Sequence, residues 1–182
     1  MKVLKADDVP HLCGMDNMEK VTRIQVEIEW PRLVEPLPII GIDPGQRNFG
    51  MALVLANTGI LFECKTDRGI TSSRDTIRTI RNAVHALIVY SGIVPRGGIV
   101  EQAAYGAPFG QVGLAEARVA AMVEVEDILE PTDDLRMVPP ATIRKAVFGH
   151  GRIKAHEAWT ELSEYPDAAS ALACAMSYFL IE

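Results

Sequence analysis

A short apolar run, Ile39 to Ile42, ends abruptly at Asp43-Pro44-Gly45, and it constrains the fold more than any other segment. Because proline and glycine stop the run, four apolar residues in succession predict a strand buried on both faces. Such a strand needs a helical layer on each side of its sheet. Asp43 then emerges where the strand meets solvent, and its carboxylate is costly to bury unless it is paired or bound to a cation.

Downstream of this strand, the hydrophobic pattern changes from strands alone to an alternation of helices and strands. We expect further strands at 49–56, 60–64, 98–101 and 135–138, and helices at 72–90, 111–129, 141–148, 154–163 and 167–179. The first three strands follow one another through tight turns, which predicts antiparallel pairing. The expected fold class is therefore α/β, with a mixed five-stranded sheet flanked by helices.

Residues 1–36 differ from the rest because they combine three prolines with little periodicity. Within them, the stretch from Ile24 to Trp30 alternates apolar and polar residues and predicts a strand with one wet face. We therefore expect an N-terminal extension over 1–36, partly flexible and with one possible extra strand, followed by a main domain over 37–182.

The overall charge and the cysteines limit the functions to consider. The net charge of −6 counts against nucleic-acid binding, although a local basic face could still contact phosphates. The three cysteines form no CxxC pair, which argues against a zinc ribbon. Neither a membrane-spanning run nor a signal peptide is recognisable, so we expect a cytoplasmic protein without membrane contacts.

Two further acids occupy places comparable to that of Asp43. A second apolar strand ends at Glu101, and Asp167 begins a helix whose small residues, 168–173, would let it lie close against the sheet. Alone, each acid could simply open a turn or cap a helix. Together, three or four carboxylates can hold two Mg²⁺ or Mn²⁺ ions about 4 Å apart.

Four motifs in this order resemble those of one known family. They are IIGIDPGQRNFGMALV, IVEQAAYGAPFGQVGLAEARVAAM, VPPATIRKAVFGHGRIKAHEAW and PDAASALACAM, and they span 38–180. They resemble the RuvC-type Holliday junction resolvases of the RNase H-like superfamily. The resemblance implies an RNase H-like nuclease domain over 37–182 and a homodimer that binds four-way DNA junctions and cuts two strands symmetrically, in DNA recombination and repair. Asp43 and Glu101 carry over directly as catalytic metal ligands.

The last motif departs from the family pattern, in which two ligands stand three residues apart. The literal alignment gives Asp167 and Ser170, and serine is a poor metal ligand. A shift of one turn instead pairs Glu164 with Asp167. Asp167 is a ligand under both alignments, whereas the fourth ligand is either Glu164 or absent.

Basic residues that could bind a nucleic acid are densest between 144 and 156. The candidates are Arg144, Lys145, Arg152 and Lys154, and by the resemblance Lys154 lies near the scissile phosphate and takes part in catalysis. The alternative is a solvated helix face. Tyr105, shortly after Glu101, could stack on a base at the junction centre or belong to the core.

Three functional hypotheses remain open from the sequence. The first is a metal-dependent endonuclease that resolves four-way junctions. The second is a nuclease of the same fold acting on other branched DNA or on RNA-containing substrates, and the third is a junction-binding relative without catalysis. The unusual extension suggests a phage or organellar variant, which leaves a nucleoid-associated, phage-infected or organellar setting open.

Overall fold

The computed structural model describes residues 1–13, 15–29, 37–45, 47–66, 72–102, 111–131 and 133–181, with the backbone alone at 111–114. The strands are β1 (Lys2–Asp8), β2 (Met18–Glu27), β3 (Ile39–Asp43), β4 (Asn48–Leu55), β5 (Thr58–Thr66), β6 (Gly97–Glu101) and β7 (Asp134–Val138). The helices are α1 (Ser73–Ser91), α2 (Gln111–Ile128), α3 (Pro140–Phe148), α4 (Ala155–Ala158) and α5 (Pro166–Ser177), with a 3₁₀ turn at Thr160–Leu162.

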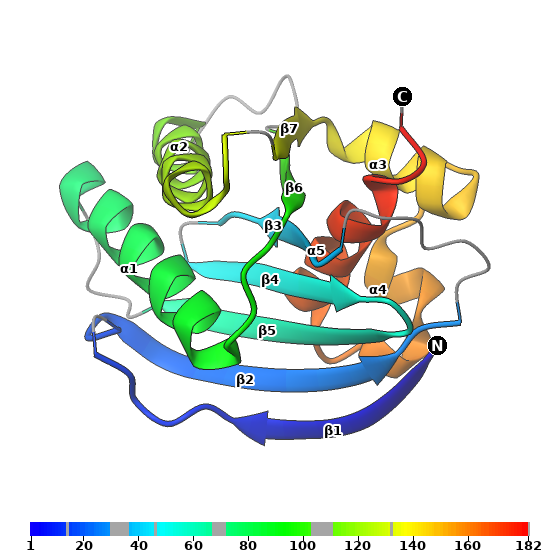
Figure 1. Ribbon diagram of the computed structural model, residues 1–182, viewed down its shortest axis with the longest axis horizontal. Coiled ribbons are helices and arrows are strands. Elements are labelled where there is room, and N and C mark those ends of the chain that lie inside the picture. Colours follow the sequence, from blue (N-terminus) through cyan, green and yellow to red (C-terminus); the bar gives the residue numbers. More distant parts are fainter. Residues whose placement is uncertain are drawn as a thin grey trace.

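The strands form one sheet in the order β1-β2-β5-β4-β3-β6-β7, with helices on both sides (Figure 1). Neighbours β3, β4 and β5 pair antiparallel, whereas β6 pairs parallel to both β3 and β7. The predicted α/β class and mixed sheet are confirmed, as is the order of strands and helices along the chain from β3 onward. The predicted count of five strands is wrong, since the described part of the chain forms seven.

The two additional strands come from the N-terminal segment. The strand expected from Ile24 is β2, which begins earlier, at Met18, and pairs antiparallel with β5 along its length. β1 was not predicted, because Val3, Leu4 and Ala6 lie among four charged residues without a regular alternation, and a register shift follows Val3. The boundary at residues 36 and 37 stays a prediction, because 30–36 lie outside the described residues.

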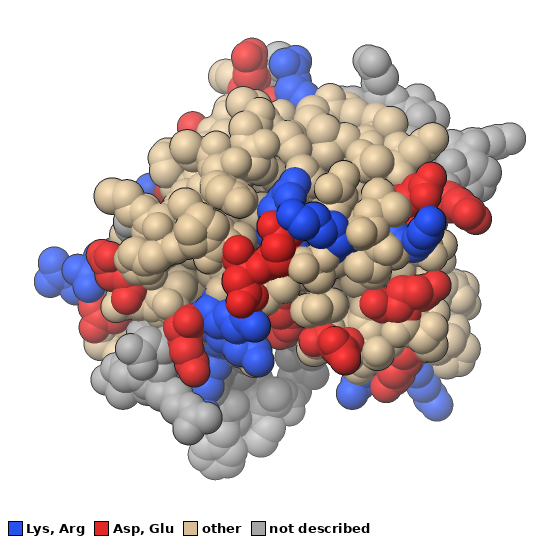
Figure 2. Space-filling view, turned by 90° about the horizontal axis from the view of Figure 1, so that it is seen from below, with Lys and Arg blue, Asp and Glu red and all other residues tan. Residues whose placement is uncertain are grey.

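β1 is one edge of the sheet, and its side chains are largely exposed. Seen from the β1 side, acidic and basic side chains are intermingled, and the described residues form no broad basic surface on this face (Figure 2). Lys5 pairs with Asp7, and Lys20 of β2 pairs with Asp8. This face therefore offers little net positive charge to a polyanion.

Two separate apolar layers cover the sheet, as the buried strand pattern requires. Ile40 and Ile42 pack with α1 and α2 on one face, and Ile39 packs with α5 on the other. α5 lies very close to the sheet at Gly41, where a Cβ would collide with the carbonyl of Ala171 and the amide of Ala175. The small residues predicted to permit this approach therefore do so. No helix in the described ranges is long and apolar enough to cross a membrane.

Candidate active site

One row of residues across the sheet carries three acidic side chains. Asp43 of β3 is paired with Gly50 of β4, and Gly50 is paired with Glu63 of β5. On the other side of β3, the parallel register that joins Ile42 to Val100 brings Asp43 next to Glu101. Because cross-strand neighbours point to the same face, these carboxyl groups all lie on the face covered by α5.

The first turn of α5 lies directly over this row. A Cβ on Gly50 would collide with the carbonyl oxygen of Asp167, so only a glycine lets the helix begin here. Asp167 is consequently held above the sheet between Asp43 and Glu63. This arrangement agrees with the prediction that the helix begun by Asp167 lies close against the sheet.

Burial and mutual repulsion make the acidic site electrostatically unfavourable. Burial, and next the charge of Asp167, raise the pKa of Asp43 to about 6. Burial and the charge of Asp43 raise the pKa of Glu101 to about 8. The pKa of Asp167 is raised too, mainly by burial. A site that resists carrying its own negative charge gains most from a bound cation.

The two candidates for the fourth ligand lie in different surroundings. Ser170 is one turn along α5 from Asp167, and its hydroxyl donates a hydrogen bond to the carboxyl of Asp43. Glu164 precedes the helix, is exposed, and lines a cleft of about 230 Å³. The cleft is also lined by Lys20, Thr22, Glu63, Lys65 and Tyr165. The position given by the literal alignment thus contacts the acids, whereas a ligand role for Glu164 stays a prediction.

Glu63 is a site residue that the sequence analysis missed. It is only 6% exposed, and its Oε2 accepts a hydrogen bond of 2.7 Å from the amide of Ala168 in the first turn of α5. Its carboxyl also makes a side-chain hydrogen bond to Asp167. Burial raises the pKa of Glu63 to about 8. The signal in the sequence was weak, because Glu63 lies inside an apolar strand and not at its end.

Two arginines stand close to the acids. Arg118 of α2 is 8% exposed, and its Nε donates to the backbone carbonyl of Glu101, at 3.1 Å. Its buried Nη1 has no hydrogen-bond partner among the residues that the structure describes. The positive charges of Arg118 and Arg144 both lower the pKa of Asp43 and of Glu101, against the effect of burial. Arg144 was a predicted nucleic-acid contact, whereas Arg118 was not singled out.

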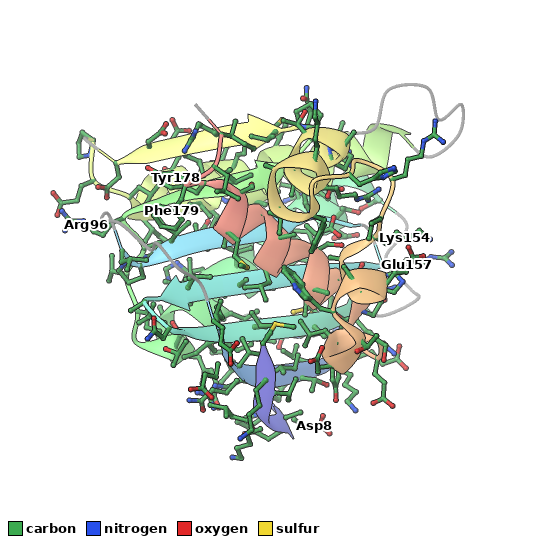
Figure 3. All side chains as sticks on the ribbon, turned by 90° about the vertical axis from the view of Figure 1, so that its right-hand side faces the viewer. Asp8, Arg96, Lys154, Glu157, Tyr178 and Phe179 are labelled. Atoms are coloured by element: carbon green, nitrogen blue, oxygen red, sulfur yellow. The ribbon has the colours of Figure 1, made fainter. Side chains whose placement is uncertain are left out.

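The remaining predicted basic residues lie along α3 and the following loop. Lys145, Arg152 and Lys154 are exposed. The backbone amide of Lys154 donates a hydrogen bond of 3.1 Å to the side-chain carboxyl of Glu157, and this bond caps the beginning of α4. Figure 3 shows Lys154 and Glu157 at the opposite end of the sheet from Arg96.

This placement puts Lys154 on the side of the acids. The amide of Arg96 bonds the carbonyl of Pro38, so Arg96 marks the end where β3 and β6 begin. Lys154 therefore lies at the end where those strands finish, at Asp43 and Glu101. The charge of His156, two residues further on, acts on Asp167 and lowers its pKa. Tyr105, the predicted stacking residue, lies outside the described residues.

The three acidic side chains are not arranged around one common metal position in this structure. Among the residues that the structure describes, no three acidic, histidine or cysteine side chains are grouped closely enough to hold one metal ion. Their charges nevertheless act on one another, Asp43 on Glu101 and Asp167 on both. Rotation of the carboxylates toward one another would be needed for joint ligation.

Comparison with known proteins identifies the fold. A structure of RuvC from Thermus thermophilus is 19% identical, with a TM-score of 0.60, and the match covers 79% of this chain and 94% of that one. A second structure, T. thermophilus RuvC in complex with a Holliday junction substrate, is 20% identical, with a TM-score of 0.61, covering 78% and 92%. No family model and no curated protein matches the chain. The likeness shows the RuvC fold, and the predicted RNase H-like fold is confirmed.

Proposed function

We propose that this chain is a metal-dependent endodeoxyribonuclease that cuts branched DNA, with Asp43, Glu101 and Asp167 as its metal ligands. The observation that carries the proposal is the convergence of these three acids, from β3, β6 and α5, at one end of the sheet. Structural carboxylates are usually arranged to keep their charge. Here burial raises all three pKa values, and repulsion by a neighbouring acid adds to the effect at Asp43 and Glu101, a pattern typical of functional sites.

The donor set fits hard divalent cations. Carboxylate oxygens are the ligands of Mg²⁺ and Mn²⁺, and we propose two such ions per site. When bound, the ions would polarise the scissile phosphate, activate the attacking water and stabilise the leaving 3′ oxygen. In this reading the carboxylates bind and orient the ions, and the clustered negative charge that is unfavourable in the free protein becomes a source of affinity.

The basic residues beside the acids would hold the substrate strand. Of the predicted basic residues, Arg144 is the one whose charge acts on both Asp43 and Glu101. Lys145, Arg152 and Lys154 extend from it along an exposed surface and would neutralise successive phosphates. Lys154 is the proposed contact to the scissile phosphate. These contacts would bind the DNA backbone without contacting the bases, which suits a protein that recognises branched DNA by its shape.

A four-way junction is the substrate that we favour. One of the two structures compared above contains RuvC bound to a Holliday junction substrate. Symmetric cleavage of a junction needs two copies of the site, so we propose a homodimer. α2 offers a surface for the second copy, because Val119 is 57% exposed and Val123 is 36% exposed on a helix already packed against α1. Exposed apolar residues of this kind are common at subunit interfaces.

One observation favours a second candidate, a junction-binding relative that does not cut. The hydroxyl of Ser170 occupies the position next to Asp43 where the resemblance implies a carboxylate. A neutral hydroxyl attracts a divalent cation less strongly than a carboxylate does. Such a protein would bind four-way junctions through the basic surface and leave them intact.

The test uses purified protein with labelled four-way junction, replication-fork, linear duplex and RNA–DNA hybrid substrates, each with Mg²⁺ or Mn²⁺. Paired nicks near the junction centre, lost in Asp43→Asn while junction binding remains, would establish the proposed function. Cleavage of forks or hybrids instead would move the activity to another substrate of the same fold. Junction binding with no cleavage under either metal would support the non-catalytic relative.

A further inference from the structure

We propose that Glu63 is a positioning residue for the metal site, holding Asp167 in place through α5. The inference rests on the proposed function, because it assigns a role within the same site. Glu63 belongs to β5, a strand that the sequence analysis did not connect with the acids.

The contacts of Glu63 fix the beginning of α5. Its Oε2 accepts the Ala168 amide at 2.7 Å, and this amide belongs to the first turn, where no carbonyl within the helix can pair with it. Gly50, next to Glu63 in the sheet, is where the carbonyl of Asp167 rests. The first turn is therefore held on both sides, by a hydrogen bond from β5 and by direct packing on β4.

The same side chain also reaches the acid that it would position. The carboxyl of Glu63 hydrogen-bonds the carboxyl of Asp167. The side chain of Asp167 is thereby directed from one side by Glu63, while Asp43 lies on the other side of Gly50 in the same row.

If Glu63 orients a metal ligand without being one itself, different substitutions of Glu63 should have different effects on metal affinity. Glu63→Gln keeps an oxygen to accept the Ala168 amide and a nitrogen to donate to Asp167, whereas Glu63→Ala keeps neither. Residues that support ligands in this way usually contribute 10- to 100-fold to metal affinity, on the order of magnitude known for other metal sites. A charged ligand, in contrast, would tolerate neither substitution.

The experiment measures Mn²⁺ binding without DNA, by calorimetry, for the wild type, Glu63→Gln, Glu63→Ala and Asp43→Asn. Glu19→Gln serves as the matched control, since Glu19 is an exposed residue of the neighbouring strand β2. We expect Kd to rise roughly 10- to 100-fold in Glu63→Ala and to stay within about threefold of the wild type in Glu63→Gln. Amide hydrogen exchange at Ala168 should accelerate in Glu63→Ala alone.

The outcomes separate this inference from the proposed function. Equal loss of Mn²⁺ affinity in both Glu63 variants would overturn it in favour of a direct ligand, and wild-type affinity in Glu63→Ala would overturn any role. Should Glu63→Ala fail to fold, the comparison of Glu63→Gln with Asp43→Asn still decides between positioning and ligation. Mn²⁺ binding with the expected pattern, but no cleavage of any DNA, would leave the role of Glu63 standing and refute the nuclease.

Discussion

Gly50 and Asp167 are in direct backbone contact, with the carbonyl oxygen of Asp167 lying where a side chain on residue 50 would begin. This contact brings the last helix down onto the middle of the acidic row. With a side chain at position 50, the first turn of α5 could not lie this close to the sheet. The position of a proposed metal ligand therefore depends on the absence of a methyl group on the neighbouring strand.

Gly50→Ala should displace the first turn of α5 and impair both stability and metal binding. Because the colliding atoms belong to the backbone, we expect a loss of about 1 to 3 kcal/mol in the free energy of unfolding. The comparison variant is Gly59→Ala, where the nearest atom, at 2.9 Å, is a side-chain methyl of Val26 and not backbone, so the loss should be smaller. Denaturant unfolding checks the prediction, and equal stability of the two variants would contradict the contact.

Ser170→Asp and Glu164→Gln distinguish the two alignments of the last motif. Since the Ser170 hydroxyl bonds Asp43, an aspartate there would add a carboxylate to the site, and we expect cleavage equal to or higher than that of the wild type. Glu164→Gln should change cleavage less than twofold, because Glu164 is exposed and lies outside α5, on the rim of a cleft beside the acids. A large loss of kcat in Glu164→Gln would instead support the shifted pairing.

The metal-free protein should lose stability as pH rises from about 5 to about 8. Asp43 and Glu101 have folded-state pKa values of about 6 and about 8, above their ordinary values of 3.8 and 4.5. In this window the folded state binds more protons than the unfolded state does, so raising the pH favours unfolding. Thermal unfolding between pH 5 and pH 8, with a metal chelator present, measures the effect.

Asp43→Asn should reduce this pH dependence. At pH 8 the substitution removes a buried charge, and we expect a gain of up to about 3 kcal/mol, since a tenfold change in a dissociation constant corresponds to about 1.4 kcal/mol. At pH 5 the gain should be about half as large, because the carboxyl is already ionised there in the unfolded state but still protonated in the folded state. With saturating Mg²⁺ at pH 8, the wild type should instead be more stable than Asp43→Asn, since only the wild type keeps all three ligands.

Val119→Glu should weaken the proposed dimer. The side chain of Val119 is 57% exposed on α2, so the substitution disturbs little within one subunit while it would place charges in an apolar interface. Analytical ultracentrifugation should show a shift toward monomer, with Val94→Glu as the control, because Val94 is 59% exposed outside α2. An unchanged dimer would locate the interface elsewhere, and a wild-type monomer would refute the dimer itself.

Local sequence patterns predicted most of the fold. The buried run before Asp43, the hairpin turn after Leu55 and the small residues of α5 each act over a few neighbouring positions, so they can be recognised without a structure. β1 was not predicted because its charged residues do not alternate regularly with apolar ones. Its pairing depends on β2, whose own partner, β5, lies more than 30 residues further along the chain.

The candidate site was predictable only where an acid ends an element. Asp43, Glu101 and Asp167 stand at such ends, so each is visible from the sequence. Glu63 and Arg118 lie inside a strand and a helix, and their roles come from cross-strand register and helix packing. Neither relationship can be read from neighbouring residues, which is why the sequence indicated three acids and not the groups that hold them.

The N-terminal strands change what kind of strand β5 is. Because β2 pairs with it, β5 is an interior strand. The edge strand on this side of the sheet is β1, which carries charged side chains. Charged rims discourage strands of other molecules from adding to a sheet. A protein shortened to residues 37–182 would leave the backbone of β5 open beside Glu63, and self-association along that strand would compete with an intact metal site.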